Sequence, residues 1–178
     1  MDRDIRLSNG ELINININFY TLKLLAQSNL SSLERKIDKL KEKLEIAKSE
    51  EKKQDINNEI NALSYEMIGK IIYIILRSNG KKVDEEEAMI LIPGDVDEIE
   101  NIFNEFFKKM EEFKKKRGIE DEDEGNDEES INVCLYHALK TLNIDEDSFW
   151  KMSPLLFYEL LEIHVKNEKE KVRAINGG

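Results

Sequence analysis

Cys134 and His137 are the two residues whose types and spacing come closest to a metal site, as Cys-x-x-His. Zinc binds thiolate and imidazole ligands, but a structural zinc site takes four of them. No second pair follows, and the only other histidine, His164, does not complete the set. We therefore expect these residues to lie on a helix surface or in a core, and we predict no metal and no cofactor.

Motifs for other kinds of chemistry are missing from the sequence as well. Phosphate-binding loops are glycine-rich, whereas Asn79-Gly80 and Pro93-Gly94 have the composition of turns. Carboxylates are abundant, yet none stands in a motif that would pair a general acid with a base. The sequence thus predicts that the protein is not an enzyme.

Eight of the ten residues from 120 to 129 are acidic and none is basic. The tract could bind a cation loosely, but a run of like charges that buries nothing is typical of a solvated linker. Without these eight acids the net charge of −11 would be −3, so the rest of the chain is nearly balanced. This balance argues against nucleic-acid binding, which needs a basic face. We expect residues 118–130 to be a disordered linker, where limited proteolysis would separate two fragments.

Composition favours a mostly α fold, because 37% of the 178 residues are charged and only two are proline. We expect a helical N-terminal domain at 1–117 and a small helical module at 131–178, on either side of the linker. The single cysteine excludes an internal disulfide and fits a reducing cytoplasm. The first residues are charged and no apolar segment follows them, so we expect no secretory signal.

One apolar helix is expected to organise the N-terminal domain. From Met67 to Arg77 only Lys70 and Arg77 are charged, and apolar residues occupy every side of a helical wheel. Such a helix is buried by its neighbours, and this one is too short to cross a membrane. Its β-branched isoleucines leave a buried strand as the alternative, but the helical period that leads into it favours a helix over 63–78.

A small β-hairpin is predicted at about 4–18. Asn9-Gly10 separates two stretches in which apolar and polar residues alternate, which is a strong hairpin signal. Only one face of this hairpin is apolar, so we expect that face to pack against the rest of the domain.

A charged helical segment is predicted at about 30–60. Its apolar stripe recurs at spacings of three and four up to Ala47 and resumes nine residues later at Ile56. Because nine residues are out of phase with a heptad, the chain either turns back as a helical hairpin near 49–55 or continues as one long helix with a solvated middle. We favour the hairpin.

Capping signals predict several helix ends. Asn79-Gly80 should end the central helix. Asp84 and Glu87 resemble a capping box at the start of a short helix. Ser153-Pro154 should begin the last helix, with proline at its first position.

Another predicted helix starts at Asp95 and ends before Gly118, with acids at its start and bases at its end, as the helix dipole favours. Its apolar stripe contains four phenylalanines and a methionine. This stripe is either a core face or an adaptable apolar surface for a client protein. The candidate client-binding residues are Phe103, Phe106, Phe107, Met110 and Phe113.

The C-terminal module presents the same two alternatives. We expect a helix at about 133–142, a turn or short helix at 145–152, and a final helix after Pro154. A module of this size has little core to spare, so its aromatic residues are either core or contact surface. The residues concerned are Phe149, Trp150, Phe157 and Tyr158.

Several segments carry a resemblance to a known family. They are Ile5-Arg6-Leu7-Ser8-Asn9-Gly10-Glu11, residues 71–79, residues 99–113, and Asp147-Ser148-Phe149-Trp150-Lys151-Met152-Ser153-Pro154 running into residues 157–164. In this order they resemble the tail assembly chaperones of long-tailed bacteriophages, or prophages, of Gram-positive bacteria. The Trp-x-Met-Ser-Pro-x-x-Phe pattern is similar to the C-terminal part of the longer form of these chaperones. The resemblance covers most of the chain except the segment 30–60, which looks like an insertion.

The resemblance implies a short form and a frameshifted longer form with a common N-terminal domain. That domain would coat the tape measure protein without ATP, using the aromatic stripe, and the C-terminal extension would recruit tail tube protein through its aromatic residues. Adenine-rich codons at Lys114-Lys115-Lys116 would suit such a frameshift. The resemblance also implies a protein of the host cytoplasm that is not part of the mature virion, with no nucleic-acid or membrane partner and with homo-oligomers allowed. The alternative is a non-enzymatic helical interaction or regulatory protein, whose acidic tract imitates DNA or binds a basic partner.

Overall fold

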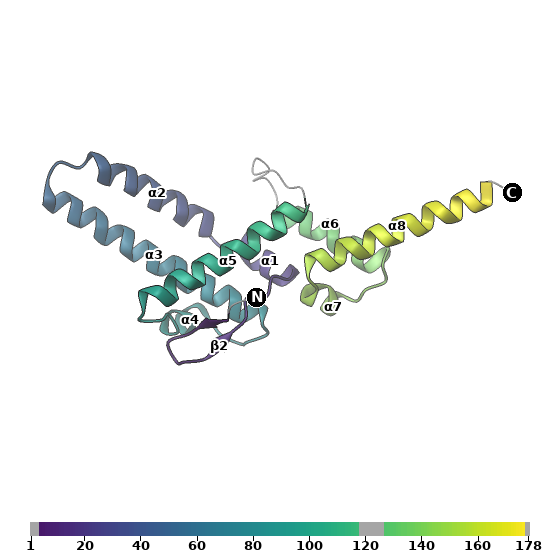
Figure 1. Ribbon diagram of the computed structural model, residues 1–178, viewed down its shortest axis with the longest axis horizontal. Coiled ribbons are helices and arrows are strands. Elements are labelled where there is room, and N and C mark those ends of the chain that lie inside the picture. Colours follow the sequence, from purple (N-terminus) through teal and green to yellow (C-terminus); the bar gives the residue numbers. More distant parts are fainter. Residues whose placement is uncertain (1–3, 118–126, 177–178) are drawn as a thin grey trace. The chain divides into compact units, whose positions relative to one another are not determined.

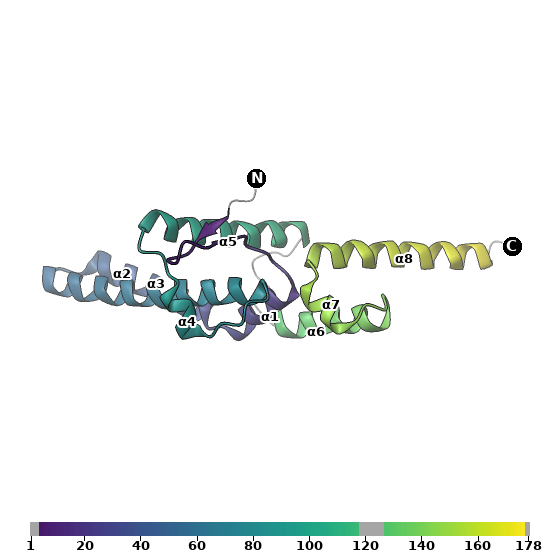
Figure 2. The same cartoon turned by 90° about the horizontal axis from the view of Figure 1, so that it is seen from below.

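The computed structural model describes residues 4–117 and 127–176, without the side chains of residues 113–117, 127–129 and 175–176. Most of the described residues are helical, which confirms the mostly α fold (Figures 1 and 2). The described strands are β1 (Ile5–Arg6) and β2 (Leu12–Ile13). The helices are α1 (Phe19–Gln27), α2 (Leu30–Ile46), α3 (Glu50–Ser78), α4 (Glu85–Ile90), α5 (Val96–Arg117), α6 (Asp127–Lys140), α7 (Glu146–Lys151) and α8 (Pro154–Asn176). None of the helices in these ranges is both long enough and apolar enough to cross a lipid bilayer.

The chain divides into two compact units. The first unit comprises Met1–Asn16 and Leu24–Lys108, and the second comprises Ile17–Lys23 and Lys109–Gly178. The sequence predicts a division at residue 117 instead. The units differ from that prediction in two places, because the segment 17–23 and the last part of α5 both belong to the second unit. The chain therefore enters the second unit twice.

The second half of α3 is the core of the first unit, as predicted for residues 63–78. Six of its side chains are 4% exposed or less: Ile68, Ile71, Ile72, Ile74, Ile75 and Leu76. The helix is capped by Asn79, and Gly80 follows with a φ of 78°, a left-handed conformation in which glycine has no steric cost. The predicted end of the central helix is thus confirmed.

The short helix α4 packs on α3 at Gly69, where α3 has no side chain. A Cβ atom on Gly69 would lie 2.0 Å from the Sδ atom of Met89, so the methionine side chain occupies this space. The predicted capping box of α4 is also present. Asp84 accepts a hydrogen bond from the Glu87 N–H at 2.8 Å, and the Glu87 carboxylate accepts one from the Asp84 N–H at 3.0 Å.

Helices α2 and α3 form the helical hairpin that we favour for the segment 30–60, and both views show them side by side (Figures 1 and 2). The turn comprises residues 47–49 and thus starts two residues before the predicted turn region of 49–55. Ser49 caps α3 by accepting a hydrogen bond from the Lys52 N–H at 3.3 Å. Leu33 on α2 and Ile56 on α3 are both buried, so the apolar stripe continues on the opposite helix. This transfer explains why its spacing loses phase after Ala47.

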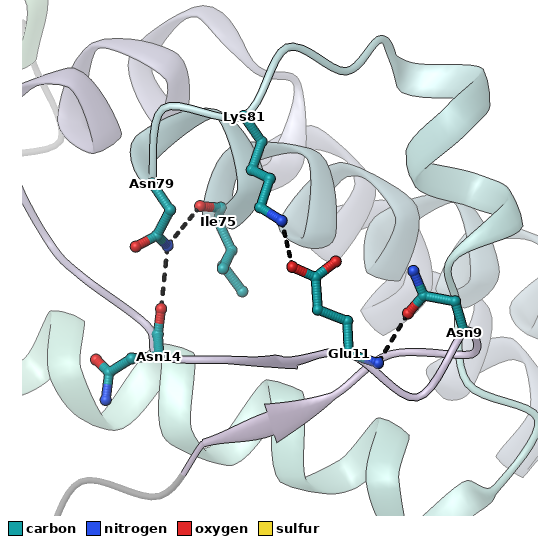
Figure 3. A network of polar contacts seen from close by, with 6 residues as sticks. All are labelled: Asn9, Glu11, Asn14, Ile75, Asn79 and Lys81. Carbon is teal, nitrogen blue, oxygen red and sulfur yellow. Dashed lines mark hydrogen bonds and ion pairs between the residues drawn. The ribbon is translucent and has the colours of Figure 1, made fainter.

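The predicted N-terminal hairpin is present but shorter than residues 4–18. Ile5 pairs with Ile13 and Arg6 pairs with Leu12 in an antiparallel register, and Gly10 in the turn has a φ of 81°. Beyond β2 the alternation of buried and exposed residues continues without strand pairing in the described chain. Instead the Asn79 side chain donates a hydrogen bond to the Asn14 carbonyl at 3.0 Å, which attaches this segment to the end of α3 (Figure 3).

The second unit contains α6, α7 and α8. Helix α6 starts at Asp127 and therefore includes the last residues of the predicted linker at 118–130, while residues 118–126 lie outside the described ranges. After α6, Asn143 adopts a left-handed φ of 55°, and Asp145 caps α7 by accepting a hydrogen bond from the Ser148 N–H at 2.9 Å. Helix α8 begins at Pro154, as predicted.

Candidate functional site

The aromatic stripe of α5 is split between two adjacent faces of the helix. Phe106 is 1% exposed and belongs to the core with Ile102, whereas Phe107 is 40% exposed and Phe103 is half-buried. Residues four apart share a helical face, so 102 with 106 and 103 with 107 form neighbouring rows. Sequence spacing alone merges these rows into one wide stripe.

Phe103 and Phe107 form a pair of parallel rings along the outer row. Their ring centroids lie 6.1 Å apart with an angle of 5° between the ring planes, and the Phe106 ring meets Phe107 edge-on at 5.6 Å. The buried Phe106 ring thus supports an accessible Phe107 ring from one side. We call Phe103 and Phe107 the outer aromatic pair.

The other two candidates on α5 lie further along the helix. Met110 is half-buried and belongs to the second unit, and the Phe113 side chain lies outside the described part of the chain. Among the candidate residues of α5, the outer aromatic pair is therefore the partly accessible set within the first unit. It is suited to binding an apolar helix of another protein, because aromatic side chains offer a large contact area at low entropic cost.

In the second unit, Phe149 and Phe157 are fully buried, with exposed fractions of 0%. Their rings lie 5.9 Å apart in an edge-on arrangement. The third ring of this cluster comes from Phe19, which stacks on Phe149 at 4.1 Å and meets Phe157 edge-on at 5.4 Å. Phe149 and Phe157 are thus core residues, and only Trp150 and Tyr158 of the candidate set are partly accessible.

Phe19 is a residue whose role the sequence analysis misses. It directly follows the predicted hairpin at about 4–18, and its sequence neighbours indicate no distant partner. Its partners lie about 130 residues further along the chain, and no local pattern reports a contact over that separation.

The indole nitrogen of Trp150 and the hydroxyl group of Tyr158 each have a polar partner. The indole N–H of Trp150 donates a hydrogen bond to the Glu146 carboxylate at 3.1 Å. The Tyr158 hydroxyl lies 3.1 Å from the Sγ atom of Cys134, which is itself buried. Both rings thus have a polar contact at the edge of the buried cluster.

Cys134 and His137, the two residues of the Cys-x-x-His pattern, have different partners. Cys134 contacts Tyr158, whereas Nδ1 of His137 lies 3.2 Å from the hydroxyl of Thr141, just after the end of α6. Across the described ranges, no three His, Cys, Asp or Glu side chains gather as a metal site would require.

Shifted pKa values occur at exposed helix caps and ion pairs. Hydrogen bonds from the Ser148 hydroxyl and N–H lower the pKa of Asp145 below its usual range. The ammonium group of Lys81 lowers the pKa of Glu11 through an ion pair (Figure 3). Both carboxylates are held in the charged form by structural contacts, which gives them stabilising roles in the fold.

The residues that carry the N-terminal part of the family resemblance also have structural roles. The Ser8 hydroxyl donates to the Ile90 carbonyl at 2.9 Å, and the Ser8 N–H donates to the Leu91 carbonyl at 3.1 Å. Asn9 accepts a hydrogen bond from the Glu11 N–H at 3.0 Å within the turn (Figure 3). This motif therefore positions the hairpin against the end of α4.

Comparisons of the chain with protein-family models, with curated proteins and with solved structures find no match.

Proposed function

We propose that the protein is a tail assembly chaperone of a long-tailed phage or prophage, which binds the tape measure protein through the first unit and recruits tail tube subunits through the second. Tape measure proteins contain long apolar helices that need to be covered until the tube polymerises around them. A chaperone of this kind works by reversible binding and requires neither ATP nor an active site. It acts in the host cytoplasm and leaves before the virion is complete.

The observation that carries this proposal is the outer aromatic pair on α5. Phe107 is 40% exposed although its neighbour Phe106 is almost fully buried. An aromatic ring supported by a buried ring is a typical anchor for an apolar partner, and such anchors contribute most of the binding energy of an interface. The resemblance in the order of the segments supplies the identity of the partner.

The second part of the proposal assigns the capture of tube protein to Trp150 and Tyr158. Both rings are partly exposed at the edge of the buried cluster and are held by polar contacts. Tryptophan and tyrosine are enriched among residues that dominate protein interfaces. Phe149 and Phe157 would support this surface from the core.

Phe107→Asp tests the binding of the tape measure protein. Co-expression with the tape measure protein of the same gene cluster should give a complex that copurifies with the wild-type chain. We expect the substitution to weaken this complex by about 30-fold or more, because it replaces an aromatic anchor with a charge. The free energy of unfolding should change by about 1 kcal/mol or less, since the side chain is partly exposed.

The matched control is Ile46→Asp, which places the same charge on the 76% exposed end of α2. The proposal predicts unchanged copurification for this variant. Equal binding by wild type and Phe107→Asp would contradict the assignment of the surface. A wild-type chain that does not bind the tape measure protein but copurifies with a basic partner would favour the regulatory alternative.

A further inference from the structure

The segment 17–23 belongs to the second unit although residues 24–108 of the first unit separate it from the rest of the second unit. This segment contains Phe19, which is 1% exposed and completes the ring cluster with Phe149 and Phe157. The Phe19 N–H also donates a hydrogen bond to the carbonyl of Met152 at 3.2 Å. The segment thus contributes both an aromatic side chain and a backbone donor to the second unit.

Local contacts fix the conformation of this segment around Phe19. The Asn18 side chain accepts hydrogen bonds from the Thr21 N–H at 2.9 Å and from the Thr21 hydroxyl at 3.0 Å, and the Thr21 hydroxyl accepts one from the Asn18 N–H at 3.1 Å. This reciprocal arrangement is a capping box that starts α1 at Phe19. The segment is therefore ordered by its own residues, and a prearranged ligand loses less entropy on binding.

A charged contact lies at the edge of the ring cluster. The Lys23 ammonium group lies 4.6 Å from the centroid of the Trp150 ring, within the range of a cation–π interaction. Lys23 is one turn of α1 after Phe19, so both side chains face the same part of the second unit. The segment accordingly has an apolar anchor and a cationic edge contact, which are the parts of a specific peptide ligand.

We propose that residues 131–178 are a binding module and that the segment 17–23 of the same chain is its ligand. The contact is sufficient to hold the C-terminal module on the chain after the backbone is cut between residues 118 and 126. The prediction that proteolysis of the linker separates two fragments changes accordingly, because the fragments should separate only under denaturing conditions. This proposal is independent of the phage function.

The test uses the full chain with a specific protease site placed after Gly125 and an affinity tag at the C-terminus. After cleavage, the C-terminal fragment is immobilised and the release of the N-terminal fragment is followed with time. We expect wild type to be retained. Phe19→Ala should speed release by about 100-fold or more, because the substitution removes a fully buried aromatic ring. Lys23→Ala should speed it about two- to fivefold, as expected for one cation–π contact.

The control is Ile46→Ala, which truncates an exposed side chain of α2 and should release at the wild-type rate. The last part of α5 remains on the N-terminal fragment in every variant, so the difference made by Phe19→Ala isolates the segment 17–23. Immediate release of the wild-type fragment, or equal rates for wild type and Phe19→Ala, would overturn the proposal. If Phe19→Ala does not fold, the test relies on Lys23→Ala. A release rate equal to that of wild type for Lys23→Ala would also overturn the proposal.

Discussion

At the scale of single residues, short polar side chains determine where the helices begin. Asp84, Asp145 and Ser49 each accept a hydrogen bond from the N–H three residues further along. These bonds satisfy N–H groups that lack a partner within the helix. The cap at Asp145 affects the candidate site most directly, because α7 carries both Phe149 and Trp150.

Asp145→Asn should make the pH dependence of stability less steep. The lowered pKa of Asp145 means that its charged form stabilises the fold above the pKa of the unfolded chain, about 3.9. This stabilisation is lost as the pH falls through the lower pKa of the folded state. Asparagine caps a helix about as well as aspartate but does not titrate. The unfolding temperature should therefore fall less for the variant than for wild type when the pH is lowered from 5 to 2.5.

Asp145→Ala provides the comparison, because it removes the cap at every pH. Its unfolding temperature should lie below that of wild type at neutral pH, where Asp145→Asn stays close to wild type. If the unfolding temperatures of wild type and Asp145→Asn change with pH in parallel, the charge of Asp145 does not contribute to the pH dependence of stability.

At the scale of elements, signals that act over a few residues are sufficient to predict most of the fold. Asn9-Gly10, Asn79-Gly80, Asp84 with Glu87, and Ser153-Pro154 each mark a turn or helix end that the structure contains. Their reliability follows from their local physics, since each depends on backbone conformation or on a nearby hydrogen bond.

Features set by distant contacts are harder to predict from the sequence. The division of the α5 stripe into a buried row and a partly exposed row depends on which elements pack on that helix. The membership of Phe19 in the second unit depends on Phe149 and Phe157, and no spacing rule connects these residues. The loss of phase in the stripe predicts the turn of the helical hairpin but places it at 49–55, whereas the structure has it at 47–49.

Gly69→Ala tests the packing of α4 on α3. Alanine favours a helix over glycine by about 1 kcal/mol, but its Cβ would lie 2.0 Å from Met89 Sδ. Overpacking of this kind costs about 1–3 kcal/mol, so we expect net destabilisation in the wild-type background. In a Met89→Ala background the space is free and the same change should stabilise the protein. Urea unfolding of wild type, Gly69→Ala, Met89→Ala and the double variant measures the coupling free energy between the two positions. Equal effects of Gly69→Ala in both backgrounds would contradict the contact between Gly69 and Met89.

At the scale of the whole molecule, the second unit is built from two segments that are not consecutive in the chain. The second unit takes one segment from before the first unit's helices and the remainder from after them. A chain that ends near residue 117 would therefore lack Phe149 and Phe157 but keep Phe19. The short form that the family resemblance implies would differ from the long form in the surroundings of Phe19 as well as in length.

Truncation after Arg117 should therefore expose apolar surface around Phe19. In the full chain this ring is 1% exposed, and its two described aromatic partners are removed by the truncation. The capping box of Asn18 and Thr21 remains, so α1 should still start at Phe19 and present its ring to solvent or to a partner. We expect the truncated chain to bind more of an apolar fluorescent dye per molecule than the full chain. Phe19→Ser in the truncated chain should reverse part of this increase, which separates the effect of Phe19 from that of other newly exposed residues. If the serine variant binds as much dye as the truncated parent, Phe19 is covered by another part of the chain.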